Sequence, residues 1–251
     1  MTLIVALRGS DGIVLAADSR GTYGDPRGVT AQKNSMMKLH KLARHVGVLL
    51  SGDAGLGNQL LASWNGDRNA SESAPELMER FRAHVRVTFG SWFPGFATQA
   101  VQGSPIPVRP DLRLLIAGFE YDGDGNPSEA VLYNLLSFYD FAPVRLDHGF
   151  ALDGVGQYAL YLFNRLYREG YGSERLKHLA AYAITETASQ DGKVGGPVRM
   201  ATISPVDGYL PVTDEEVASI LQQNTRRSDG LRKSFFGEET KRHDRRRSRK
   251  K

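Results

Sequence analysis

Cysteine is absent from this chain of 251 residues. Its absence excludes disulfide scaffolds, thiolate zinc sites, iron–sulfur clusters and cysteine nucleophiles. Long apolar runs are lacking too, since no stretch approaches the ~20 residues of a membrane-spanning helix. Residues 1–8 have no basic segment before their apolar stretch, so they fit neither a signal peptide nor a transit peptide. We therefore expect a cytoplasmic protein that makes no use of a membrane.

Patterns typical of metal, phosphate or dinucleotide binding are also missing or weak. The six histidines are not spaced with carboxylates as metal ligands are, and no phosphate loop occurs. Gly154-x-Gly156-x-x-Ala159 fits a dinucleotide fingerprint, and Glu174 lies about twenty residues further on. However, Glu174 follows a predicted helix and not a second strand, which favours glycines that serve close packing. We expect neither a metal nor a cofactor.

Positive charge is concentrated at the C-terminal end. The chain has a net charge of +4, but residues 226–251 hold twelve Lys/Arg and four Asp/Glu, which leaves the rest of the chain at −4. We expect one folded domain over residues 1–222 and a basic, disordered tail over residues 223–251. A solvated extension is favoured over a nucleic-acid-binding tail.

The body of the chain has the composition of one globular domain, with 41% hydrophobic and 24% charged residues. Residues 20–30 and 92–110 are rich in Gly and Pro and are expected as loops. The apolar periods predict strands at 3–7, 12–17, 36–42, 45–50, 112–121, 130–136 and 198–203, and helices at 56–64, 77–89, 157–167 and 176–187. This order is not a regular βαβ alternation, so it favours an α+β fold with two antiparallel sheets and helices outside them.

Thr2 can combine two catalytic roles. Methionine aminopeptidases generally remove Met1 when the second residue is small, and removal would free an α-amine on a residue that also has a hydroxyl. An α-amine has a pKa of roughly 7.7–8.0, so part of it is neutral at cellular pH and can accept the hydroxyl proton. Taken alone, Thr2 is better explained as an ordinary strand residue, and only its surroundings favour the catalytic interpretation.

Two charged residues beside apolar strands strengthen the catalytic interpretation. Asp18 ends the second predicted strand, and Lys38 lies inside the third. A buried lysine is costly without a partner, and Asp18 is a suitable one. A cation near Thr2 would lower the pKa of the threonine groups and favour an alkoxide-like nucleophile.

The N-terminal pattern resembles a known family. Thr-x-Ile-Val-Ala…Asp-Gly-Ile-Val-Leu-Ala-Ala-Asp-Ser-Arg-Gly-Thr, from Thr2 to Thr22, is similar to the amino-terminal hairpin of proteasome β-type subunits. Less specific similarities are the loop at 51–55, the strand at 109–119, and the glycine turns at 153–156 and 191–196. Together they extend from Thr2 to about residue 205. The resemblance implies the N-terminal-nucleophile hydrolase fold, a four-layer αββα sandwich.

The resemblance also implies roles for individual residues. Thr2 would be nucleophile and base, Asp18 would orient Lys38, and Lys38 would lower the pKa of Thr2. The Gly52 amide would stabilise the tetrahedral oxyanion, and Asp191 would support the Thr2 amine. Substrate binding would involve two residues that pair with an extended peptide and four that form a specificity pocket, apolar with one titratable wall: Gly21 and Thr22, then Met36, His40, Leu50 and Ala54.

The implied activity is threonine-type endopeptidase action on peptides or unfolded polypeptides. The implied assembly is a homo-oligomeric ring, with a second subunit type or an ATPase as further partners left open. Two departures matter, because Val155 and Val194 stand where the family has serines. They keep two alternatives open: a catalytically silent subunit with a structural role, and a related amidase that cleaves small amides. The loop at 20–30 is also longer than is usual in the family.

Overall fold

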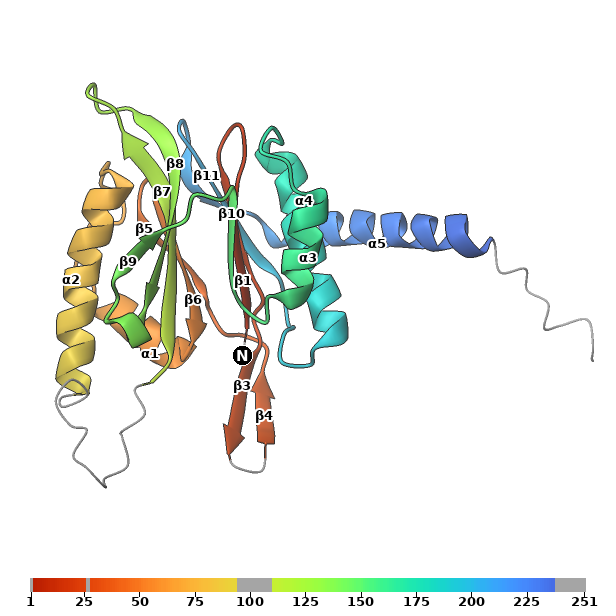
Figure 1. Ribbon diagram of the computed structural model, residues 1–251, viewed down its shortest axis with the longest axis horizontal. Helices are drawn as coiled ribbons and strands as arrows, with labels where there is room; N and C mark the ends of the chain where they lie inside the picture. Colours follow the sequence, from red (N-terminus) through yellow and green to blue (C-terminus); the bar gives the residue numbers. More distant parts are fainter. Residues whose placement is uncertain (1, 26–27, 94–109, 238–251) are drawn as a thin grey trace, which may run out of the picture.

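The computed structural model describes residues 2–25, 28–93 and 110–237. Its main elements are two five-stranded antiparallel sheets, a separate two-stranded hairpin and five α-helices within those residues (Figure 1). The arrangement confirms the expected α+β class with antiparallel sheets.

The first sheet contains the start of the chain. Its strand order is β10-β1-β2-β11-β12, formed by β1 (Leu3–Arg8), β2 (Ile13–Ala17), β10 (Phe150–Gly154), β11 (Arg199–Ser204) and β12 (Gly208–Pro211). A tight turn joins β1 to β2, where the Gly9 amide donates to the Gly12 carbonyl over 2.7 Å. β1 therefore lies between β10 and β2, and the first residues of the chain are held at the centre of the sheet.

The second sheet is built from the middle of the chain. Its order is β5-β6-β7-β8-β9, formed by β5 (Leu39–Ala43), β6 (Val46–Gly52), β7 (Leu112–Tyr121), β8 (Pro127–Leu136) and β9 (Pro143–Arg145). A short 3₁₀ helix, η1 (Ser137–Tyr139), follows β8. β6 and β7 are nearly continuous apolar runs because both faces of this sheet are covered.

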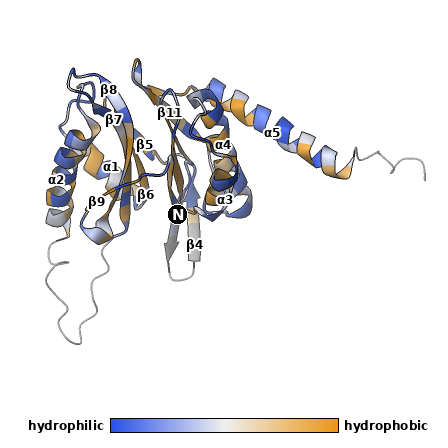
Figure 2. Cartoon of the chain, turned by 45° about the horizontal axis from the view of Figure 1, so that its top comes forward, coloured by the Kyte–Doolittle hydropathy of each residue, from blue (hydrophilic) through white to orange (hydrophobic). Residues whose placement is uncertain are grey.

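Three apolar clusters hold the layers together, and the two-residue period of the strands assigns side chains to them. In β1, Ile4 and Ala6 face the second sheet, whereas Leu3, Val5 and Leu7 face the helices α3 (Gln157–Leu166), α4 (Ser173–Gln190) and α5 (Asp214–Phe236). The helices α1 (Ala54–Ser63) and α2 (Ala74–Trp92) pack on the outer face of the second sheet. Figure 2 shows the hydrophobic colour concentrated along the strands and the helix faces against them.

The segment expected as a loop at 20–30 is instead a hairpin. β3 (Gly21–Asp25) and β4 (Gly28–Lys33) pair in antiparallel fashion, with Gly21 opposite Lys33. These strands carry glycine and polar residues, so they lack the apolar alternation by which a strand is recognised in a sequence. The strand expected at 36–42 begins only at Leu39, which leaves Lys38 just ahead of it.

The C-terminal helix was not expected. α5 crosses the predicted boundary at 222/223, and Figure 1 shows it extending away from the sheets. Thr213 caps it by accepting a hydrogen bond from the Glu216 amide, and Val217 and Ile220 are buried against the body. Thr213 and Glu216 form the Thr-x-x-Glu pattern of a capping box, which marks the start of a helix and is visible in the sequence.

Two segments covered by the sequence-based expectations lie outside the described residues: 238–251, and 94–109 of the loop expected at 92–110. The domain division stays a prediction.

Within the described residues, no helix combines the length and apolarity that crossing a membrane requires.

Phe81 tests the packing between α2 and the second sheet. Its side chain is fully buried and meets Trp64 edge-on, with ring centroids 5.3 Å apart. We expect Phe81→Ala to lower the free energy of unfolding by about 3–5 kcal/mol, because the cavity cannot close completely. The control is Val87→Ala on the same helix, where Val87 is 74% exposed; a change within about 0.5 kcal/mol is expected there in denaturant titration. Equal effects of both substitutions would contradict this account.

His45 gives the fold a pH dependence. Its Nε2 donates to the Pro205 carbonyl over 3.1 Å, and its Nδ1 accepts from the Tyr121 hydroxyl over 2.7 Å. Burial lowers the pKa of His45 below its usual 6.5. The unfolded chain therefore binds this proton more readily, so stability is present above about pH 6.5 and is lost as the pH falls toward the lowered value.

The measurement is the free energy of unfolding at pH 7 and at about pH 5. We expect His45→Gln to lose less stability over this interval than the unaltered protein does. His148→Gln, a substitution of an exposed histidine, should keep the original slope. An unchanged slope in His45→Gln would show that His45 is not the responsible group.

Candidate active site

Thr2 lies immediately before β1 and is buried, with 3% of its surface exposed. Its carbonyl accepts a hydrogen bond from the Val155 amide over 2.7 Å. Gly154 makes this approach possible: its φ is +94°, and a Cβ there would lie 1.9 Å from the Thr2 carbonyl oxygen. The end of β10 thus fixes the backbone of Thr2.

The Thr2 hydroxyl lies between two charged side chains. β1 pairs with β2, which brings Asp18 beside the start of β1, where its amide donates to the Leu3 carbonyl over 3.1 Å. Thr2 Oγ1 donates to Asp18 Oδ1, and Lys38 Nζ donates to Thr2 Oγ1. Lys38 Nζ also lies 2.7 Å from Asp18 Oδ1. The three side chains form one closed triangle of polar contacts.

This charged pair is fully buried and well satisfied. Asp18 is 0% exposed and Lys38 is 2% exposed. Asp18 also accepts from the amides of Leu3, Arg20 and Gly195 at 3.0, 3.2 and 3.0 Å, and Lys38 Nζ donates to the Arg20 carbonyl at 2.6 Å. Buried charges are tolerable only with such partners. The network therefore holds Lys38 in one orientation against the Thr2 hydroxyl.

Burial lowers the pKa of Lys38 below its usual 10.5, while Asp18 acts in the opposite direction by stabilising the ammonium. Arg20 adds a further lowering effect. Lys38 therefore releases its proton more readily than a lysine in water does. An ammonium with a lowered pKa is also a stronger hydrogen-bond donor to a developing alkoxide on Thr2.

Thr2 and Lys38 of this triangle line a cavity of ≈ 470 Å³. Gly52, at the end of β6, lies across this cavity from the chain start; its φ is +77°, and a Cβ there would lie 2.1 Å from the Asp111 carbonyl oxygen, so only glycine fits. The cavity is lined by Thr2, Arg20, Gly21, Thr22, Tyr23, Met36, Lys38, Gly52, Asp53, Ala54, Gly55, Pro110 and Asp111.

The cavity brings together most of the residues predicted as a site. Among the residues predicted as catalytic, Thr2, Lys38 and Gly52 line it, and Asp18 lies directly behind them. Among the predicted substrate contacts, four line it: Gly21, Thr22, Met36 and Ala54. These seven lining residues come from β3, β6 and α1 and from segments next to β1 and β5, so only the folded chain places them together.

Leu50 and His40 are not among the lining residues. Leu50 is fully buried in the cluster between the second sheet and α1–α2, because alternate residues of β6 face that side. His40 is a partly buried residue of β5, and burial lowers its pKa. The cavity is therefore less apolar than a pocket containing Leu50 would be, and Asp53 and Asp111 are among the residues that line it.

Asp191 lies at the end of α4 and shapes a neighbouring turn. Its carboxylate accepts from the Lys193 amide over 2.8 Å, and its carbonyl accepts from the Val194 amide over 3.1 Å. This turn presents the Gly195 amide to Asp18. Within the described contacts, Asp191 thus reaches the site through the turn and has no direct hydrogen bond to Thr2.

The two valines in the glycine turns are packing residues. Val155 is 5% exposed and Val194 is 0% exposed, and both belong to the apolar cluster between the first sheet and its helices. The polar contacts at these turns come from backbone amides, Val155 to Thr2 and Gly195 to Asp18. The network around the Thr2 hydroxyl is therefore closed without side-chain hydroxyls at these positions.

Arg20 is a site residue that the sequence analysis did not single out. Besides its backbone contacts with Asp18 and Lys38, its guanidinium donates to the carbonyls of Gly192 and Val194, at 2.8 and 3.2 Å. It thereby ties the turn at 191–196 to the end of β2. Its position two residues after Asp18 was the only signal in the sequence.

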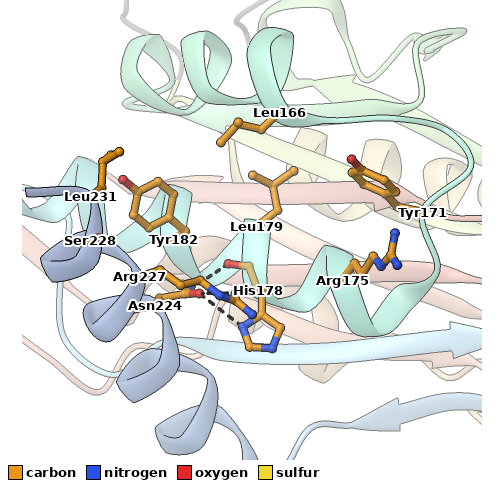
Figure 3. A pocket seen from close by; sticks show the side chains of 10 residues that line it. All are labelled: Leu166, Tyr171, Arg175, His178, Leu179, Tyr182, Asn224, Arg227, Ser228 and Leu231. Atoms are coloured by element: carbon orange, nitrogen blue, oxygen red, sulfur yellow. Dashed lines mark hydrogen bonds between the residues drawn. The ribbon is translucent and has the colours of Figure 1, made fainter. Parts of the chain in front are cut away.

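A second cavity of ≈ 290 Å³ lies between α3, α4 and α5 (Figure 3). In its floor, Asn224 donates to the His178 carbonyl over 2.8 Å, and Arg227 donates to the Asn224 side-chain oxygen over 3.2 Å. This cavity shares no lining residue with the one at Thr2. Among the described residues, no group of three or more histidine and carboxylate side chains is placed to hold a metal ion.

Comparisons with known proteins agree on one family. A family model described as "Proteasome subunit" matches residues 2–65. The chain is 26% identical to "Proteasome subunit beta 2" of Thermomonospora curvata, covering 91% of this chain and 79% of that protein. It is 23% identical to "Proteasome subunit beta" of Methanopyrus kandleri, covering 88% and 95%. The matched N-terminal segment includes Thr2, Asp18, Lys38 and Gly52.

Similar solved structures include Anbu (ancestral beta-subunit) from Yersinia bercovieri, with a TM-score of 0.68 and 16% identity over 93% of this chain and 96% of that one. The Anbu complex from Pseudomonas aeruginosa, solved as a helical assembly, gives a TM-score of 0.69 and 16% identity over 93% and 95%. At this identity the likeness shows that the fold is shared.

The buried pair predicts a large effect of Asp18→Asn. This substitution leaves the Lys38 ammonium buried opposite a neutral amide, and we expect a loss of about 3–5 kcal/mol in the free energy of unfolding. The matched control is Glu79→Gln, which breaks the exposed ion pair with Arg82 and should cost no more than about 1 kcal/mol. Denaturant unfolding of both variants checks this, and a similar small loss in each would show that the Asp18–Lys38 pair is not desolvated.

Proposed function

Because this chain belongs to the proteasome β-type subunit family, we propose that it is a threonine-type endopeptidase subunit of a proteasome-like complex. The nucleophile is the Thr2 hydroxyl after removal of Met1. The observation that carries this proposal is the position of Thr2 Oγ1, which contacts both Lys38 Nζ and Asp18 Oδ1 at the end of an open cavity. A threonine that is only a strand residue needs no buried ion pair around its hydroxyl.

In the first step, the freed α-amine of Thr2 accepts the hydroxyl proton, and Oγ1 attacks the carbonyl carbon of a peptide bond. The Lys38 ammonium stabilises the negative charge on Oγ1, and Asp18 keeps the ammonium in place. The tetrahedral intermediate carries its charge on the former carbonyl oxygen, and in this proposal the Gly52 amide donates a hydrogen bond to it. Donors of this kind typically contribute ~2.7–4 kcal/mol to lowering the barrier.

In the second step, the intermediate collapses and the C–N bond breaks. The leaving amine takes the proton from the Thr2 ammonium, and the acyl group remains as an ester on Oγ1. Water then attacks the ester while the α-amine accepts its proton. The C–Oγ1 bond breaks, Oγ1 takes that proton back from the α-ammonium, and the second product leaves as a carboxylic acid. Atoms and charges balance without a metal or cofactor.

The β3 edge supplies the substrate-binding contacts in this proposal. Gly21 and Thr22 line the cavity on that strand, and an extended peptide can add to such a backbone as a further strand. Met36 and Ala54 supply the apolar part of the cavity wall.

In the proposed arrangement the two sheets and their helices form the four-layer αββα sandwich of N-terminal-nucleophile hydrolases. Several copies assemble into a closed ring that admits unfolded polypeptides. Asp191 supports the site through its turn.

Intact mass and a fluorogenic peptide assay test the proposal together. We expect the mature protein to lack Met1, and Thr2→Ala to abolish hydrolysis, because the substitution removes the nucleophile while the fold is retained. Thr225→Ala, at an exposed position of α5, should leave the activity unchanged. A native protein that retains Met1 would defeat the enzymatic proposal, and hydrolysis of small amides without any peptide cleavage would point to an amidase.

A further inference from the structure

Two neighbouring aspartates, Asp53 and Asp111, line the cavity at Thr2. Asp53 follows β6 and Asp111 precedes β7, and both line the cavity beside Gly52. The Asp53 amide donates to the Asp111 carbonyl over 2.6 Å, which joins the two residues directly. Because Gly52 pairs with Leu112 in the second sheet, the same strand pairing fixes both carboxylates next to the proposed oxyanion donor.

The negative charge of this acidic wall, Asp53 with Asp111, is not balanced by its neighbours. Asp111 pairs with Arg113 over 3.0 Å, but Arg113 also pairs with Asp153 over 3.1 Å. Asp53 uses Oδ1 to cap α1 through the Leu56 amide, and within the described residues it has no ion pair. Asp111 and Asp153 therefore share one guanidinium, while Asp53 has none, and the negative charge of the two lining aspartates exceeds the positive charge paired with them.

The positive groups of the cavity are committed elsewhere. The Lys38 ammonium is neutralised by Asp18. The Arg20 guanidinium donates to carbonyls of the turn at 191–196 and to the Asn34 side chain. Neither cation contacts Asp53 or Asp111 among the described residues, so neither side chain neutralises these two aspartates.

We propose that this wall makes the site select substrates with a lysine or arginine side chain next to the scissile peptide bond, with Asp53 and Asp111 as the specificity-determining residues. The inference rests on the proposed function of Thr2 as the nucleophile. A guanidinium or ammonium at this wall replaces the missing counter-charge and also reduces the repulsion between the carboxylates and the nearby oxyanion. Both carboxylates are accessible to solvent, so the selection is moderate and weakens with salt.

The kinetic test uses two fluorogenic peptides that differ only in the residue before the cleaved bond, arginine in one and leucine in the other. We expect the unaltered protein to favour the arginine peptide about tenfold in kcat/KM, which corresponds to ~1.4 kcal/mol. The double variant Asp53→Asn/Asp111→Asn should lose most of this preference and cleave the leucine peptide at least as fast as the unaltered protein, because the repulsion of the oxyanion is removed. Asparagine keeps the side-chain shape and still caps α1.

Asp124→Asn is the matched control, since it removes one carboxylate from the turn between β7 and β8, and it should keep the full preference. Raising the salt concentration should reduce the preference of the unaltered protein but not that of the double variant. Equal or better cleavage of the leucine peptide by the unaltered protein would overturn the inference while leaving the proposed peptidase function intact.

A binding measurement separates the two proposals if hydrolysis is absent. The Thr2→Ala protein is titrated with the same two peptides carrying a fluorescent label, and anisotropy gives the Kd of each. Tighter binding of the arginine peptide, lost in Thr2→Ala/Asp53→Asn/Asp111→Asn, supports the acidic wall even if no peptide is cleaved. Equal affinity for both peptides in Thr2→Ala would overturn it, whatever the activity of the intact protein.

Discussion

The structure of the site depends on one buried ion pair, Lys38 with Asp18. Two charges without solvent are unfavourable unless further hydrogen bonds satisfy them, and here backbone groups of Leu3, Arg20 and Gly195 complete the set. Each contact comes from a different part of the chain. The hydrogen bonds that stabilise the Lys38–Asp18 pair therefore connect β1, the end of β2, the segment before β5 and the turn after α4. The Thr2 hydroxyl contacts both charged side chains.

Two glycines allow close backbone contacts around the site. Gly154 allows the end of β10 to contact the Thr2 carbonyl, and Gly52 allows the end of β6 to turn against Asp111. Side chains fill the space behind them: Val155 and Val194 pack into the apolar cluster under α3 and α4. Backbone amides thus carry the polar contacts at the turns. A hydroxyl there is one way to stabilise such a site, and a well-packed turn with an oriented amide is another.

The cavity brings the buried Thr2 hydroxyl together with Gly52, Asp53 and Asp111, and the last three come from one pair of strand ends. β6 ends at Gly52 and continues into Asp53, while Asp111 leads into β7. The proposed oxyanion donor and the proposed specificity residues therefore depend on the same strand pair, β6 with β7. The cavity between α3, α4 and α5 lies on another face and belongs to the packing of α5 (Figure 3).

The sequence by itself determined the fold class and the strands of the N-terminal hairpin, because these depend on local apolar periods. The association of Thr2, Asp18, Lys38 and Gly52 was predicted through the resemblance to proteasome β-type subunits, which begins with a motif contiguous along the chain. The hairpin at β3–β4 and the helix α5 were not foreseen, since polar strands and a polar-faced helix show weak periodicity. Tertiary structure alone decided that Leu50 enters the core, that Asp191 acts through its turn, and that Arg20, Asp53 and Asp111 border the cavity. Those outcomes depend on strand register and on contacts between residues far apart in the chain, which no local pattern records.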